Sequence, residues 1–187
     1  MKKIKNLTLN LGLRLAFLVV IFLSSSCSDD DDGPKEDQKE DLEANLTTLV
    51  NGAALNAANG IAIGPDGNLY VASVTGQEIV VMDKSNGNII ERIKEGVQSP
   101  DDLVFGPDGS LYWTDILTGE VGRRTPDGVV KKQPFLGGVN PIAFNDEGRL
   151  FIALDFQGDG FYEFDPELDA DPKPIIECPT GFCLGFF

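Results

Sequence analysis

The chain contains no histidine and only three cysteines among its 187 residues. Without histidine, a Ser–His–Asp triad or a Cys–His nucleophile pair is excluded. Cys178 and Cys183 form a poor zinc pattern on their own. In an exported protein they could form a disulfide across the four residues between them. We favour the alternative that they are buried or incidental thiols.

Long apolar runs are also missing. The longest, Leu15–Leu23, has nine residues, whereas a transmembrane helix needs about 20. Basic residues precede this run, and three serines follow it before Cys27. The segment resembles a bacterial lipoprotein signal, so we expect residues 1–27 to direct export and Cys27 to be lipidated. The alternative is an ordinary cleaved signal with an incidental cysteine.

Residues 28–46 have almost no apolar side chains, no aromatic residue and an excess of Asp and Glu. Such a composition cannot bury enough surface to fold, and we expect a disordered tether. The acidic cluster directly after Cys27 resembles that of surface-displayed lipoproteins of the Bacteroidetes. This resemblance implies an outer-membrane lipoprotein exposed at the cell surface; a solvated spacer without a targeting role is the alternative.

Positive charge is scarce, and the net charge of the whole chain is −15. Nucleic acid is therefore disfavoured as a partner, because its phosphates need Lys and Arg for neutralisation. A surface rich in carboxylates instead favours hard cations such as Ca²⁺, which prefer oxygen ligands.

One pattern does recur, and it occurs three times. It spans Asn59–Ser73, Asp101–Asp115 and Asn140–Leu154, and its aligned glycines, Gly67, Gly109 and Gly148, are spaced by 42 and 39 residues. Each copy has a turn before a β-rich run, as in Pro65-Asp66-Gly67. Repeats of this length with turn–strand chemistry predict β-propeller blades. The predicted fold is therefore all-β.

We expect residues 47–187 to form a partial β-propeller of about three four-stranded blades. The predicted strands are 60–63, 68–74, 78–83 and 89–93; 103–105, 110–116, 120–124 and 129–135; and 142–144, 149–156, 160–165 and 173–177. Residues 46–50 match the register of a fourth strand from a preceding blade. Propellers hold about four to eight blades, so we expect either a chain truncated after about three or one that needs a partner to complete it. The open strand edges of such a chain favour self-association.

At these repeats the chain resembles the SMP-30/gluconolactonase/LRE-like family of six-bladed propellers, with NHL- or YWTD-like repeats. The residues that carry the resemblance are Asn59-Gly60, Ser99-Pro100-Asp101-Asp102, Pro107-Asp108-Gly109, Tyr112-Trp113-Thr114-Asp115 and Asn140-Pro141. Only the second repeat has the Tyr-Trp-Thr-Asp sequence, so it does not indicate a receptor propeller.

The resemblance implies a site at the start of the inner strands. Asn59, Asp101 and Asn140, each eight residues before an aligned glycine, would hold Ca²⁺, or another divalent cation such as Mg²⁺ or Zn²⁺. Asp101 or Asp102 would be the general base that activates water. Asn and Asp at such positions also cap turns, which is the structural alternative. Asp115 and Asp155, which end second strands, are interpreted as structural or rim residues. Tyr70, Tyr112 and Phe151 are interpreted as core between blades, and Trp113 as core or rim packing.

The implied activity is hydrolysis of a lactone or ester, and the implied partner is a lactone or sugar-derived small molecule. We expect truncation to impair this activity. The alternative is a non-catalytic propeller lipoprotein that binds sugars or protein partners at the cell surface.

Overall fold

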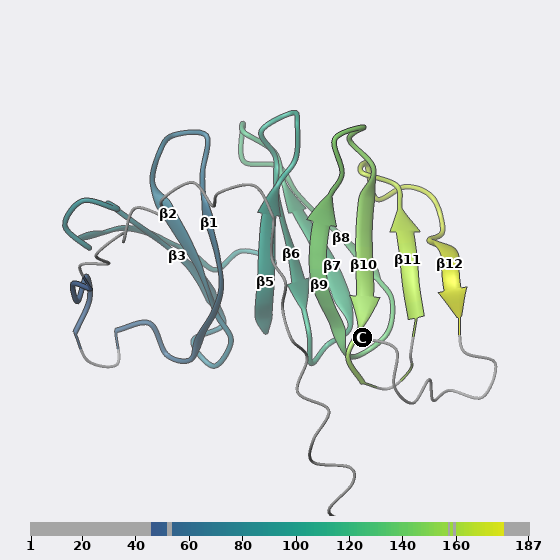
Figure 1. Ribbon diagram of the computed structural model, residues 1–187, viewed down its shortest axis with the longest axis horizontal. Helices are drawn as coiled ribbons and strands as arrows, with labels where there is room; N and C mark the ends of the chain where they lie inside the picture. The colour runs from purple at the N-terminus through teal and green to yellow at the C-terminus, as the bar shows by residue number, and fades with distance from the viewer. Residues whose placement is uncertain (1–45, 52–53, 157, 159, 178–187) are drawn as a thin grey trace, which may run out of the picture. The chain divides into compact units, whose positions relative to one another are not determined.

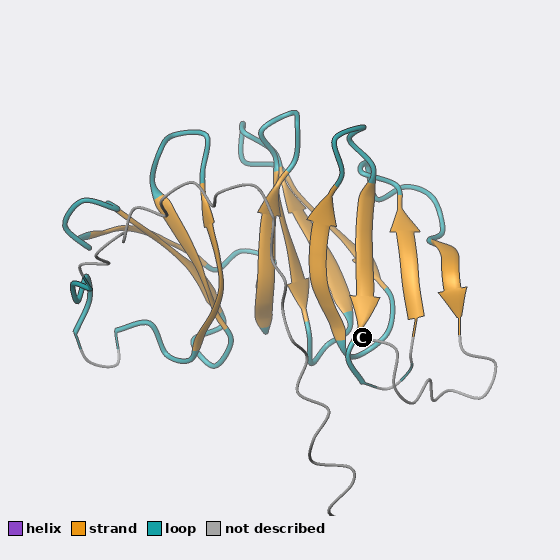
Figure 2. Ribbon diagram, viewed as in Figure 1, coloured by secondary structure: helices purple, strands orange, loops and turns teal. Residues whose placement is uncertain are grey.

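The computed structural model describes residues 46–51, 54–156, 158 and 160–177. Its strands are arranged in three antiparallel sheets of four (Figures 1 and 2). No helix in this part of the chain is long and apolar enough to cross a membrane. The predicted signal, Cys27, almost all of the predicted tether, Cys178 and Cys183 lie outside the described residues.

In each sheet the strands follow one another in chain order. The first contains β1 (Ala58–Ile63), β2 (Leu69–Ser73), β3 (Glu78–Met82) and β4 (Ile89–Ile93). The second contains β5 (Pro100–Phe105), β6 (Leu111–Asp115), β7 (Glu120–Arg124) and β8 (Val130–Pro134). The third contains β9 (Val139–Phe144), β10 (Leu150–Leu154), β11 (Gly160–Phe164) and β12 (Lys173–Glu177).

The turns between the first two strands of each sheet form for the reason that the repeat predicts. Gly67, Gly109 and Gly148 have φ angles of 80°, 81° and 75°, a region that side chains with a Cβ rarely enter. In the first turn, Asp66 accepts a hydrogen bond from the backbone N–H of Asn68 at 3.1 Å. Local chemistry thus sets the length of each hairpin and the register of the strands that follow.

Apolar side chains pack in two clusters, one between each pair of successive sheets. The ring of Tyr70 meets that of Phe105 edge-on at 4.9 Å, and Tyr112 meets Phe144 in the same way at 5.0 Å. Trp113 is fully buried. The predicted inter-blade roles of Tyr70 and Tyr112 and the core role of Trp113 are confirmed. Phe151, predicted to share this role, is instead half-buried and stacks on Phe161 of its own sheet. The repeated packing is that of a partial β-propeller.

Two predictions about strands were wrong. Residues 46–50 form no strand; a Cβ at Gly87 would lie 2.3 Å from the carbonyl oxygen of Leu49, so this segment passes close to the β3–β4 turn. The three inner strands also begin two or three residues earlier than predicted. The predicted candidate residues therefore lie within strands and not in the loops before them.

Candidate functional site

The candidate residues share a structural feature, an irregularity in the inner strands β1, β5 and β9. In β1 the register shifts between Ala58 and Ile61, and in β5 between Pro100 and Asp102. In β9, Val139 pairs with Leu154 whereas Ile142 pairs with Ile152, so two residues oppose one. Asn59, Asp101 and Asn140 each lie in such a bulge. Bulges re-aim side chains and occur often beside functional sites.

The first two candidates are in direct contact. The Asn59 side chain donates a hydrogen bond from Nδ2 to Oδ1 of Asp101 at 2.6 Å, joining β1 to β5. Asp101 is only 7% exposed, while Asn59 is exposed. The amide therefore holds one oxygen of a buried carboxylate in place.

Asn140 pairs with a residue that the sequence analysis did not place in the site. Its Nδ2 donates to Oδ2 of Asp155 at 3.2 Å. The Oδ1 atom of Asn140 is buried and has no hydrogen-bond partner among the described residues. A buried polar atom without a partner is costly in a folded protein, and such an atom calls for an explanation.

Electrostatics connect the two pairs. Burial raises the pKa of the Asp101 carboxyl above its ordinary value, and the negative charges of Asp155 and Asp102 raise it further. The hydrogen bond from Asn59 acts in the opposite direction without cancelling this shift. Asp101 and Asp155 are therefore close enough to repel one another, and the site has an excess of negative charge.

Asp102, the competing candidate for general base, is held differently. Its Oδ1 accepts from the backbone N–H of Leu103 at 2.9 Å, and its Oδ2 accepts from that of Ile142 at 3.1 Å. The second bond joins β5 to β9. Both carboxylate oxygens are thus engaged by the backbone, and Asp101 is the better placed of the two for proton transfer.

A close backbone approach brings β1 and β5 together at this point. A Cβ at Gly60 would lie 2.6 Å from Cα of Asp102 and 2.7 Å from the carbonyl oxygen of Asp101. Only glycine allows the two strands to approach so closely. The Asn-Gly pair in the first repeat therefore supplies both a polar side chain and the space that it needs to reach Asp101.

The two acids that end second strands have different surroundings. Asp115 is fully buried and accepts from the backbone N–H groups of Gln98 and Ser99 and from the Trp113 indole, so its predicted structural role is confirmed. Asp155 is exposed and bonds Asn140. The register of β9 against β10 brings Asp155 next to the β9 bulge. The repeat alignment alone does not predict this register.

The candidate residues offer two kinds of oxygen ligand for a cation, carboxylate oxygens and amide oxygens. Among the residues that the structure describes, no three His, Cys, Asp or Glu side chains are grouped as a metal cluster. The donors available are the carboxylates of Asp101 and Asp155 and the amide oxygens of Asn59 and Asn140. A set of two acids and two neutral amides suits a hard cation.

Neither a protein-family model nor a curated protein matches the chain. Among solved structures, it is similar to virginiamycin B lyase from Staphylococcus aureus, with 18% identity, a TM-score of 0.57, and coverage of 67% of this chain and 42% of that one. It is also similar to a gluconolactonase from Xanthomonas campestris, with 22% identity, a TM-score of 0.55, and coverage of 66% and 50%.

A third similar structure is a protein of unknown function from Bacteroides caccae, with 19% identity, a TM-score of 0.51, and coverage of 73% of this chain and 51% of that one. The chain thus spans about half the length of the solved structures that it matches. At these identities the likeness concerns the fold: the chain has the β-propeller architecture of these proteins.

Proposed function

We propose that this chain is a divalent-cation-dependent hydrolase of lactones or esters, similar to SMP-30/gluconolactonase proteins, with Asp101 as general base. The observation that carries the proposal is the pairing of Asn59 with Asp101, and of Asn140 with Asp155, at the bulges of successive inner strands. The likeness to a solved gluconolactonase supports it at the level of the fold.

The side chains present fit a hard divalent cation. The Oδ1 atom of Asn140 has no hydrogen-bond partner among the described residues and is available as a ligand for a cation. The positive charge of the cation would also offset the repulsion between carboxylates that raises the pKa of Asp101. Asn59, Asp101, Asn140 and Asp155 would hold the ion. Ca²⁺ or Mg²⁺ suits these oxygens better than Zn²⁺, which prefers the histidine that the chain lacks.

The bound cation would polarise the carbonyl of the substrate and stabilise the negative charge that develops on its oxygen. Asp101 would accept a proton from the attacking water. The positive charge of the cation would favour the ionised form of Asp101, which is the form that accepts a proton. The hydrogen bond from Asn59 engages Oδ1 of Asp101, and within the described part of the chain Oδ2 is available for this step.

The test is hydrolysis of gluconolactone by the full chain in the presence of Ca²⁺, followed by acid release at constant pH. We expect Asp101→Asn to lower kcat by at least about 100-fold, the usual effect of removing a general base. Asp127→Asn, which changes an exposed acid in the β7–β8 turn, is the matched control. Equal rates for Asp101→Asn and the unmodified chain would refute this role. Calcium binding without turnover of any lactone would favour the non-catalytic binding propeller.

We propose further that the chain is exported and anchored to the outer membrane through lipidated Cys27, with its propeller at the cell surface. The acidic tether and the signal-like N-terminus support this location. Labelled palmitate should be incorporated into the native chain but not into Cys27→Ser. Protease added to intact cells should degrade the native protein if it faces outward, and complete protection would place it on the periplasmic side.

A further inference from the structure

The two outer faces of the three-sheet array have the same kinds of side chain as the faces that pack inside it. Tyr70 and Tyr112, three residues after their aligned glycines, each contact a Phe on the inner strand of the next sheet, Phe105 and Phe144. Phe151 is the third residue at this repeat position. No next sheet follows it among the described residues.

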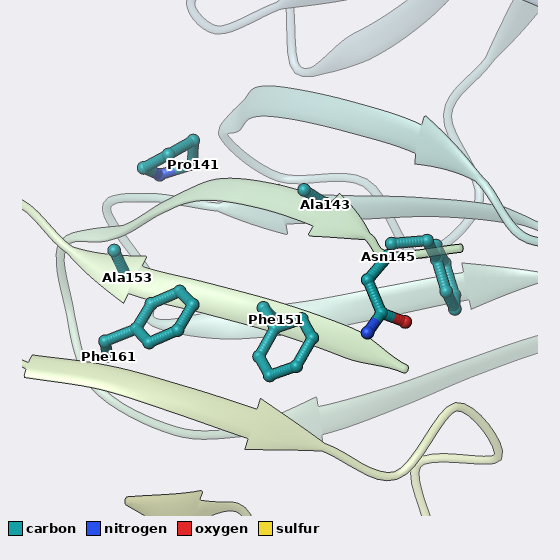
Figure 3. A pocket seen from close by; sticks show the side chains of 7 residues that line it. Pro141, Ala143, Asn145, Phe151, Ala153 and Phe161 are labelled. Carbon is teal, nitrogen blue, oxygen red and sulfur yellow. The ribbon is translucent and has the colours of Figure 1, made fainter. Parts of the chain in front are cut away.

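Around Phe151 the face is apolar and hollowed (Figure 3). Phe151 stacks on Phe161 with a centroid distance of 5.3 Å, and a depression of about 210 Å³ is lined by these two rings with Pro141, Ala143 and Ala153. At its edge, Arg149 lies 5.1 Å from the centre of the Phe151 ring and pairs with Glu163. This is a small apolar surface with a charged rim.

The opposite face of the array, on β1, has the complementary residues. Ile61 and Ile63 occupy the repeat positions of Leu103 and Phe105 in the second sheet and of Ile142 and Phe144 in the third. Leu103 and Ile142 are buried by the preceding sheet, with 4% and 5% exposure, whereas Ile61 and Ile63 are 65% and 53% exposed. Ile61 and Ile63 differ from their equivalents in that no preceding sheet covers them among the described residues.

The segment before β1 leaves this part of the face open. Leu49 lies next to the β3–β4 turn, and the Ala54 carbonyl accepts a hydrogen bond from Arg92 of β4 at 3.1 Å. The segment therefore lies toward the far strands of the first sheet. The inner strand β1, which is the strand that a preceding aromatic ring would contact, stays exposed.

We propose that two copies of this chain associate head to tail, so that Phe151 of each copy packs on Ile61 and Ile63 of the other. The internal packing of β1 on β5 and of β5 on β9 would be repeated at both junctions. Two sets of three sheets would form a ring of six, within the range of about four to eight blades in propellers.

A closed ring gives this proposal a definite stoichiometry. A head-to-tail interface whose rotation closes yields a finite assembly, and one that does not close yields a filament. The full chain, with Cys27→Ser to prevent lipidation, should have a mass by light scattering of twice the 20.2 kDa of one chain. A monomer at tens of micromolar, or a growing series of larger species, would overturn the proposal.

Single substitutions test which faces of the chain form the interface between the two copies. Ile63→Asp and Phe151→Asp should each give monomers, because each defect occurs at both junctions of the dimer. Ile90→Asp and Ile176→Asp change equally apolar residues, 57% and 52% exposed, on the edge strands β4 and β12, and should leave the dimer intact. Loss of the dimer in these controls would show that strand edges associate instead.

Mixing provides a test that tolerates partial unfolding of any one variant. Ile63→Cys and Phe151→Cys, each with Cys27, Cys178 and Cys183 changed to Ser, should form a disulfide-linked heterodimer on mild oxidation. Neither variant alone should cross-link efficiently. Cross-linking of Phe151→Cys to itself would indicate a face-to-face dimer and contradict the head-to-tail arrangement.

Discussion

At Asp101, folding and the proposed catalysis favour different protonation states of the same carboxyl group. It is 7% exposed, and its pKa is raised by burial and by nearby carboxylates. A group whose pKa is higher in the folded state than in the unfolded state favours folding at low pH and loses that contribution as the pH rises. The ionised form that a general base requires is therefore the form that destabilises the fold.

Asp101→Asn should consequently stabilise the protein at neutral pH, by about 0.5–1 kcal/mol when no cation is present. The amide keeps an oxygen to accept the bond from Asn59 and removes the buried charge. The difference should shrink as the pH falls toward about 3.5, below the ordinary pKa of Asp. Urea unfolding with a chelator at both pH values is the measurement. A variant less stable than the native chain at pH 7 would contradict this account.

Asp155 influences Asp101 through its negative charge. Because this charge helps to raise the pKa of Asp101, Asp155→Asn should lower that pKa, and the titration of the Asp101 carboxyl carbon should shift to lower pH. NMR with labelled aspartate and a chelator gives the value directly, using Asp127→Asn as control. An unchanged titration would separate Asp155 from the site.

At the scale of elements, Asp102 links two sheets. It accepts a backbone hydrogen bond from Ile142 of β9 while lying on β5. Asp102→Ala leaves that N–H and the one of Leu103 without their acceptor, and should reduce the free energy of unfolding by about 1–3 kcal/mol. Asp102→Asn, which keeps one acceptor oxygen, should cost less. Equal stability of all three proteins in urea would remove Asp102 as a structural link.

The strands were predictable because their signals are local. Turn glycines and alternating apolar residues determine each hairpin, and the prediction located all twelve described strands. The bulges were not predictable, because they depend on contacts between sheets, such as the close approach at Gly60. Residues 46–50 were predicted as a strand from register alone, but a strand also requires a partner for its hydrogen bonds, and the described part of the chain offers none.

The shared position of the candidate residues in the inner strands was predictable for the same reason. Asn59, Asp101 and Asn140 share one repeat position, and the structure places each in an inner-strand bulge. Asp155 was not assigned to the site, because its contact with Asn140 arises from the pairing of β9 with β10. The different roles of the neighbours Asp101 and Asp102 also required their hydrogen bonds.

For the whole molecule, the architecture links the two proposals. Successive sheets bring their inner strands together, and the bulges of these strands provide the oxygen atoms that would surround a cation. Head-to-tail pairing of two copies would add a second set of inner strands. The cation site can be tested whether or not the copies pair, because Asn59, Asp101, Asn140 and Asp155 all come from one chain.

Calorimetric titration of the full chain with Ca²⁺ tests the central claim most directly. We expect saturable binding to the native protein, at least about tenfold weaker binding, or 1.4 kcal/mol, to Asp101→Asn and to Asp155→Asn, and unchanged binding to Asp127→Asn. Absence of binding to the native chain, or equal binding by all four proteins, would contradict a cation site at the inner-strand bulges.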